Sequence, residues 1–129
     1  MGRSAIDQQI TFLSVADIAR TDKFYNQQLG LALALDQGGC RIYQVAEGAF
    51  IGACQRENLP EKKEGVVFTL VTEDVDGWHQ HLVEQGIEVE QPPAENLTYN
   101  IYNMFFRDPD GYLLEIQRFL DPDWMQPAE

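Results

Sequence analysis

Few side chains in this 129-residue chain are placed where they would support catalysis or metal binding. The histidines His79 and His81 lie two positions apart in a predicted helix, so they point to different faces and fit a solvated helix surface better than a shared metal site. The cysteines Cys40 and Cys54 form no CxxC pair, and they give no support to a zinc or redox motif. Glu115, an acid between apolar residues of a predicted strand, is the strongest candidate that remains.

Glu115 belongs to the second of two similar halves of the chain. A shift of 56 positions lays residues 12–17 over 68–73, and residues 30–33 over 86–89 without a gap. Each half predicts a strand, a helix that begins at an acidic N-cap and ends at a glycine, and three further strands. The sequence therefore predicts a duplicated βαβββ arrangement.

The expected α+β domain covers residues 8–120 and contains two modules, about 8–56 and 65–120, with a polar linker between them. A C-terminal tail, residues 121–129, follows, and we expect its Trp124 and Met125 to dock onto the body of the protein or onto a dimer partner. A loop is expected at Pro92-Pro93. Strands are expected at residues 10–15, 31–35, 41–45, 49–54, 66–72, 88–90, 99–107 and 112–118.

A hairpin with a two-residue loop at residues 47–48 sets the expected positions of the cysteines. Since side chains alternate between the faces of a strand, this register places the thiols of Cys40 and Cys54 on opposite faces. A disulfide is disfavoured unless the loop shifts the register.

The formal net charge of -12 removes the attraction that supplies most nonspecific affinity for phosphate backbones. Nucleic acids and anionic membranes are therefore not expected as partners. No window approaches the about 20 apolar residues of a membrane helix, and the first residues lack the apolar run of a signal peptide. We expect a cytoplasmic protein with reduced cysteines.

Two stretches of the sequence carry a family resemblance. The first combines Val15-Ala16-Asp17 with Phe24-Tyr25 and Leu29-Gly30-Leu31, and the second combines residues 106–111 with Leu114-Glu115-Ile116. They resemble the glyoxalase/bleomycin-resistance/extradiol-dioxygenase group, also called the vicinal oxygen chelate superfamily. The resemblance covers about residues 10–118 and implies curved mixed sheets around a cavity, often completed in a homodimer.

The resemblance also implies where a divalent metal would bind, and this chain departs from that pattern. The first-strand ligand position falls at Ile10, its repeat mate at Val66, and the fourth-strand position near Gly52. Only Glu115 matches a ligand. Ile and Val have no lone pair to donate, and one carboxylate cannot build the three-ligand site that a catalytic transition metal typically needs. No cofactor is expected, with a divalent metal on displaced ligands as the alternative.

Strand alternation predicts which side chains would line the cavity with Glu115. A plain four-residue turn at residues 108–111 puts Tyr102 and Met104 on its face, whereas a bulge would substitute Asn103 and Phe105. Filling of the core is an equally good interpretation of the three phenylalanines of the predicted set. The predicted ligand-binding residues are Phe12, Ser14, Phe50, Cys54, Phe68, Tyr102, Met104 and Glu115.

These observations favour a homodimer that binds or sequesters a small hydrophobic molecule, which can also be cationic, without the usual metal. The alternative is an enzyme, either a metal-dependent lyase, isomerase or dioxygenase with displaced ligands, or an acid-base catalyst centred on Glu115. A third hypothesis is an interaction module that kept the fold and lost the site.

Overall fold

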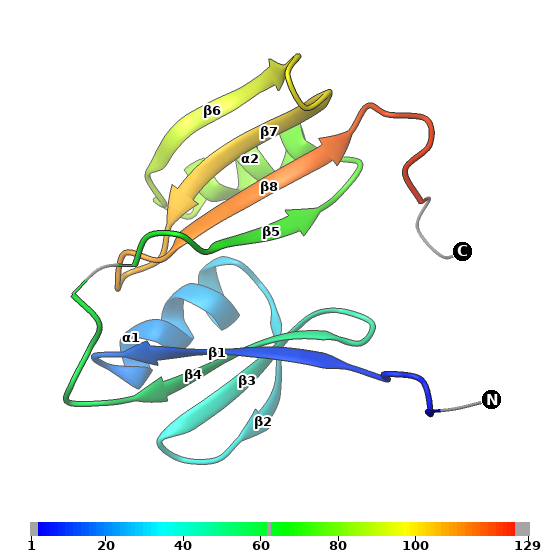
Figure 1. The fold of residues 1–129 in the computed structure, drawn as a ribbon. Coiled ribbons are helices and arrows are strands. Elements are labelled where there is room, and N and C mark those ends of the chain that lie inside the picture. Colours follow the sequence, from blue (N-terminus) through cyan, green and yellow to red (C-terminus); the bar gives the residue numbers. More distant parts are fainter. Residues whose placement is uncertain (1–2, 62, 126–129) are drawn as a thin grey trace. The chain divides into compact units, whose positions relative to one another are not determined.

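The computed structural model describes residues 3–61 and 63–125, which form two compact units (Figure 1). The first unit covers residues 1–62 and the second covers residues 63–129. Each unit has a four-stranded mixed sheet and a helical segment after its first strand. The duplicated βαβββ fold predicted from the sequence is confirmed.

The strand order of the two sheets is the same. In the first unit it is β1-β4-β3-β2, in the second it is β5-β8-β7-β6, and in each the first strand runs parallel to the last. The first unit contains β1 (Gln9–Val15), α1 (Ile18–Asp22), η1 (Lys23–Gln28), β2 (Ala32–Asp36), β3 (Cys40–Ala46) and β4 (Ala49–Gln55). The second contains β5 (Val67–Val71), α2 (Val75–Glu84), β6 (Val89–Asn96), β7 (Ile101–Arg107) and β8 (Leu113–Phe119).

An aspartate begins the helical segment of each unit. The Asp17 carboxylate accepts hydrogen bonds from the amides of Ala19 and Arg20, and the Asp74 carboxylate accepts one from Gly77. These contacts satisfy amides that have no partner within the helix. No helix among residues 3–61 and 63–125 is long and apolar enough to cross a membrane.

One face of each sheet packs against the helical segment of its own unit. In the first unit, buried Tyr43 stacks on Tyr25 with ring centroids 5.7 Å apart and donates a hydrogen bond to Asp22. Burial and this hydrogen bond raise the pKa of Tyr43, so the phenol stays protonated at neutral pH. In the second unit the corresponding buried layer consists of Val75, Leu82, Met104, Phe106, Leu114 and Ile116.

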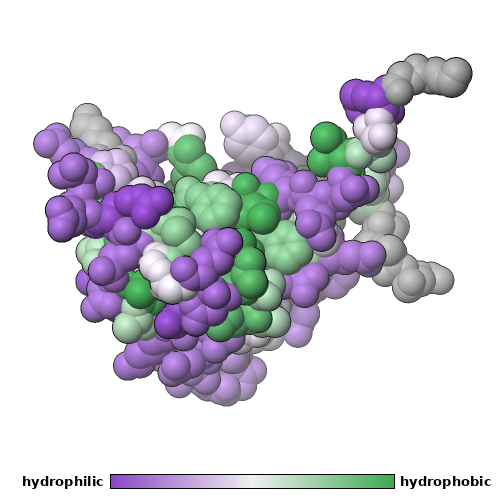
Figure 2. All heavy atoms as spheres, turned by 90° about the horizontal axis from the view of Figure 1, so that it is seen from below, coloured by the Kyte–Doolittle hydropathy of each residue, from purple (hydrophilic) through white to green (hydrophobic). Residues whose placement is uncertain are grey.

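The opposite, open face of each sheet has no helix of its own unit on it. In the first unit this face carries Ile10, Phe12 and Leu35, which are 38%, 51% and 50% exposed. Figure 2 looks at the molecule from below and shows hydrophobic side chains gathered together, with hydrophilic ones around them.

The two units differ by one residue in their helical segments. The N-caps Asp17 and Asp74 are 57 positions apart, whereas the glycines that follow the helices, Gly30 and Gly86, are 56 apart. In η1 the amide of Leu29 bonds to the carbonyl of Phe24, five residues back, which is the wider turn of a π-helix. The first unit therefore has one extra residue in η1. The gapless alignment with a shift of 56 is wrong for the residues before η1, where the correct shift is 57.

Strand β6 extends through the segment expected to be a loop. Its bounds, Val89–Asn96, include Pro92 and Pro93, and its pairing with β7 is irregular on both sides of Gln91. Proline cannot donate a hydrogen bond, but β6 is an edge strand and its outer side needs no donor. The loop prediction is wrong because an edge strand accommodates both prolines.

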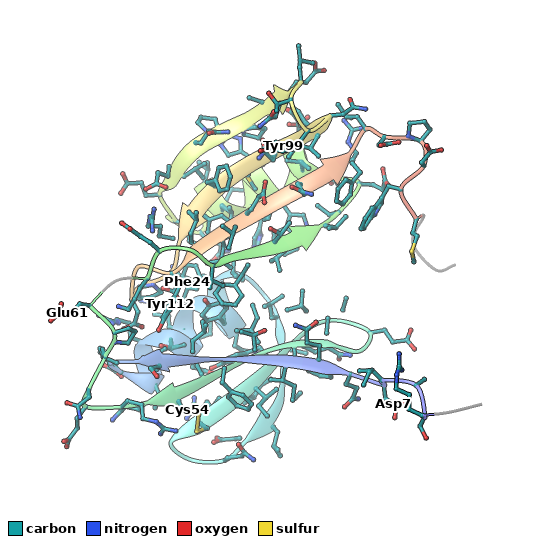
Figure 3. All side chains as sticks on the ribbon, in the orientation of Figure 1. Asp7, Phe24, Cys54, Glu61, Tyr99 and Tyr112 are labelled. Carbon is teal, nitrogen blue, oxygen red and sulfur yellow. A yellow bond between two sulfur atoms is a disulfide. The ribbon has the colours of Figure 1, made fainter. Side chains whose placement is uncertain are left out.

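Cys40 and Cys54 form a disulfide between β3 and β4, with Cα atoms 4.1 Å apart (Figure 3). The predictions of opposite faces and of free thiols are wrong here. Ala46 pairs with Ala49 as expected, but Gln44 pairs with Phe50, so Val45 is an extra residue in β3. This β-bulge shifts the register by one position and sets the two cysteines directly opposite each other.

The disulfide predicts a redox-dependent stability. The disulfide closes a loop with a sequence separation of 14 and so restricts the unfolded chain. For a loop of this size, the restriction raises the free energy of unfolding by about 3 kcal/mol. Reduction of the wild-type protein should lower its free energy of unfolding by up to that amount in urea titrations. The double variant Cys40→Ala/Cys54→Ala should be insensitive to reductant, and a wild-type curve that reductant leaves unchanged would contradict the pairing.

Candidate functional site

Glu115 lies near the middle of β8, on the open face of the second sheet. It pairs with Thr69 of β5 on one side and Phe105 of β7 on the other, and it is only 9% exposed. Burying a carboxylate away from water is costly unless other groups bond to it. The side chains around Glu115 therefore decide what the site is able to do.

Three neutral side chains donate hydrogen bonds to the Glu115 carboxylate. The Thr69 hydroxyl donates to Oε1 at 2.8 Å, and the Asn103 amide donates to Oε2 at 2.7 Å. The hydrogen-bonding surroundings of Gln117 place its amide nitrogen 2.8 Å from Oε2 and 3.3 Å from Oε1. All three groups bond to the charged form of the carboxylate.

Among residues 3–61 and 63–125, no basic side chain forms an ion pair with Glu115. The basic side chains of the second unit from residue 63 on are placed elsewhere. Lys63 donates to the carbonyl of Asp110, Arg107 pairs with Glu90 at 3.0 Å, and Arg118 lies over the ring of Tyr102. The charge of Glu115 is stabilised by dipoles and is not neutralised by a cation of the described chain.

A pocket of about 480 Å³ opens over Glu115. This volume is in the range typical of small-molecule sites, about 300–1,000 Å³. One of the residues around it is Tyr99, on the turn between β6 and β7 (Figure 3). We call this cavity the Glu115 pocket. Its lining consists of Gln91, Asn96, Tyr99, Ile101, Asn103, Phe105, Glu115, Gln117 and Phe119.

The tail after β8 supports one wall of this pocket. The ring of Trp124 stacks on Phe119 with centroids 3.9 Å apart and an interplanar angle of 22°. The chain reaches this position through a turn in which the Trp124 amide bonds to the Asp121 carbonyl. Trp124 thus docks onto the body of the second unit as expected, whereas Met125 is 79% exposed.

Tyr102 and Met104 do not share the face of Glu115, contrary to the plain-turn prediction. The amide of Gly111, a residue with φ +92°, bonds to the carbonyl of Asp108, and the Asp108 amide bonds to the carbonyl of Tyr112. This three-residue loop with a bulge adds one residue, so Asn103 and Phe105 face the pocket. Met104 is fully buried, and the Tyr102 hydroxyl donates to Asp76 of α2, which raises the pKa of Tyr102.

Phe68 also lies on the helix-covered face, where its ring meets that of Tyr112 edge to face. The prediction for Phe68 is wrong because the one-residue difference between the units reverses the expected alternation in β5. The same slip explains why sequence reasoning missed Thr69. The expected loop at Pro92-Pro93 hides Gln91 and Asn96, which belong to β6, whereas Tyr99 lies on the turn before β7 and not in the strand expected at residues 99–107.

The remaining predicted residues lie on the open face of the first unit, on β1 and β4. The register pairs Ile10 with Phe50 and Ser14 with Cys54, and Phe12 with Gly52. A Cβ atom at Gly52 would lie 2.5 Å from the ring of Phe12, so only glycine allows the ring to lie there. None of these side chains belongs to the Glu115 pocket.

Comparison with known proteins identifies the family. The profile of the Glyoxalase/Bleomycin resistance protein/Dioxygenase superfamily matches residues 8–116. This chain belongs to that superfamily. It is similar to the uncharacterized protein YraH of Bacillus subtilis, with 26% identity over 121 residues that cover 84% of this chain and 94% of YraH.

Two solved structures of superfamily proteins share the fold. One, from Nocardioides, has a TM-score of 0.76 and 19% identity and covers 100% of this chain and 92% of its own. The other, from Alicyclobacillus acidocaldarius, has a TM-score of 0.78 and 16% identity and covers 93% and 96%. At these identities the likeness concerns the fold alone.

The metal positions implied by the superfamily resemblance do not carry a suitable donor set in this chain. The side chains of Ile10 and Gly52 have no ligand atom. Val66 lies just before β5, and the offset of 57 between the N-caps makes Val67 the residue that corresponds to Ile10. Val67 has no ligand atom either. Around Glu115 the described neighbours turn N–H and O–H donors toward the carboxylate. This arrangement does not fit a transition metal, which needs lone pairs from several side chains.

Metal analysis tests this conclusion. After dialysis against Ni²⁺, Zn²⁺, Mn²⁺ and Fe²⁺ in turn, elemental analysis should find no stoichiometric metal that depends on Glu115. The wild type and Glu115→Ala should retain the same trace amounts, because a single carboxylate binds these ions weakly. One equivalent of metal in the wild type that is lost in Glu115→Ala would contradict it.

Proposed function

We propose that the protein binds or sequesters a small, largely hydrophobic molecule in the Glu115 pocket, and that this binding needs no metal. The observation that carries the proposal is the combination of an apolar, aromatic wall with one buried carboxylate that neutral donors hold in place. Small-molecule sites combine apolar lining with polar groups that set the orientation, and here Ile101 and the rings of Tyr99, Phe105 and Phe119 lie beside five amide and carboxylate side chains. A positively charged group on the ligand would complement Glu115.

The charge distribution supports a cationic ligand. Residues 63–129 contain 14 of the 21 acidic side chains but only three of the nine basic ones. A pocket within a negatively charged unit raises the local concentration of cations and lowers that of anions. We therefore favour a hydrophobic cation over a hydrophobic acid.

The enzyme hypotheses receive less support from the same geometry. A general base must reach the proton that it removes, but the lone pairs of Glu115 are directed to Thr69, Asn103 and Gln117. A metal-dependent lyase, isomerase or dioxygenase would need ligands that the residues around Glu115 do not supply. We therefore place binding before catalysis.

The proposal keeps the homodimer and the cytoplasmic location expected from the sequence. The exposed apolar side chains Ile10, Phe12 and Leu35 on one face of the first unit support burial against a second copy.

Ligand-induced stabilisation tests the proposed function. Two phenols serve as probes, meta-tert-butylphenol and its charged analogue meta-hydroxyphenyltrimethylammonium. A probe that binds the native state should add about 1.4 kcal/mol of stability at ten times its Kd, and the melting temperature should keep rising with the logarithm of the probe concentration above that. It should also change the fluorescence of Trp124, which stacks on the pocket residue Phe119.

A pair of variants locates the binding site. Phe119→Ala removes a pocket wall and should abolish the stabilisation, whereas Val83→Ala, at an exposed position of α2, should leave it unchanged. Equal stabilisation of both variants would place the bound probe outside the Glu115 pocket and contradict the proposal.

A further inference from the structure

We propose that the Glu115 pocket selects fully alkylated ammonium ions over primary ammonium ions of similar size. This inference rests on the proposed function, because it names the class of ligand for the same pocket. It follows from three features of the second unit: the occupied lone pairs of Glu115, the aromatic side chains around it, and the absence of a basic side chain paired with it among the described residues.

The hydrogen-bonding capacity of Glu115 is already used. A carboxylate has about four lone-pair positions on its two oxygens. Oε2 takes the amides of Asn103 and Gln117, and Oε1 takes the hydroxyl of Thr69 together with the longer contact to Gln117. A ligand N–H group would have to displace one of these donors, which would then lose its own partner, or compete with Gln117 for the position of its longer contact.

At the rim of the pocket, the side-chain oxygen of Asn96 is occupied as well. Its Oδ1 accepts hydrogen bonds from the amides of Thr98 at 3.0 Å and Tyr99 at 3.3 Å, in the turn between β6 and β7. A primary ammonium has three N–H donors and is strongly hydrated, so it needs acceptors to replace the water that it loses. The oxygens of Glu115 and Asn96 are occupied, so the side-chain acceptors left in the lining are neutral ones, such as the amide oxygens of Gln91 and Asn103, which bind an ammonium less strongly than a carboxylate does.

A fully alkylated ammonium has different requirements. It has no N–H donor, its charge is spread over methyl groups, and it binds to the faces of aromatic rings and near negative charge. The pocket offers the rings of Tyr99, Phe105 and Phe119 around the carboxylate. Stacking of Trp124 holds the Phe119 ring in place, so part of this aromatic wall is ordered before a ligand binds.

The charge of Glu115 still acts on such a ligand although its lone pairs are occupied. Hydrogen bonds from neutral groups stabilise the carboxylate without cancelling its negative charge, and the low exposure of Glu115 weakens screening by water. The described basic side chains of the second unit contact other groups. A cation in the pocket would therefore supply the opposite charge that the described side chains do not.

Three probes of matched shape separate these effects in calorimetric titrations at neutral pH. They are meta-hydroxyphenyltrimethylammonium, the protonated primary amine meta-(aminomethyl)phenol and the neutral isostere meta-tert-butylphenol. On the wild-type protein the quaternary cation should bind about tenfold or more tighter than either of the others. A primary amine that binds as tightly as the quaternary cation would overturn the selectivity.

The outcomes also separate this inference from the proposed function. If the neutral isostere binds as tightly as the quaternary cation, the pocket is a hydrophobic site without cation selectivity, and only the further inference fails. If none of the three probes binds, the proposed function fails with it. Both comparisons use the wild-type protein and do not depend on how a variant folds.

Two substitutions identify the atoms responsible. Glu115→Gln should lower the affinity for the quaternary cation to that of the neutral isostere. Thr69→Val opens a position on Oε1, so it should reduce the preference over the primary amine several-fold, whereas Thr11→Val in the first unit should leave this ratio unchanged. An unchanged ratio in Thr69→Val would contradict the role assigned to the occupied lone pairs.

Discussion

The site depends on how the charge of a buried carboxylate is stabilised when no described basic side chain pairs with it. Glu115 is held by Thr69, Asn103 and Gln117, one donor from each of the strands β5, β7 and β8. Their contacts offset the desolvation of the charge and fix the orientation of both oxygens. The register of all three strands must be correct for this arrangement, so the turns and bulges of the second unit determine the chemistry of the pocket.

The same strand positions have a different content in the first unit. The N-caps are 57 positions apart, and with this offset Thr69 corresponds to Phe12. On the neighbouring strand, Thr69 pairs with Glu115, whereas Phe12 pairs with Gly52. One unit therefore presents an aromatic ring over a glycine, and the other a hydroxyl bonded to a carboxylate. The duplicated fold carries a polar site in one half and an apolar surface in the other.

The architecture could be predicted from the sequence because its signals are local and repeated. The N-caps Asp17 and Asp74 and the β-rich segments around them specify the order of the elements. The faces of the strands were harder to predict, since a single extra residue reverses them. Three such residues reverse predicted faces: one in η1, one at Val45 and one in the turn that contains Gly111. They account for the errors at Phe68, at the cysteines, and at Tyr102 and Met104.

The neutral donors and the carboxylate of Glu115 stabilise each other. A double-mutant cycle with Asn103→Leu and Glu115→Leu, read from urea unfolding, measures this directly. We expect Asn103→Leu alone to be strongly destabilising and the cycle to give a coupling energy of about 1.5–3 kcal/mol, the size of a hydrogen bond to a charged group. Additive effects of the two substitutions, with a coupling energy near zero, would contradict the account.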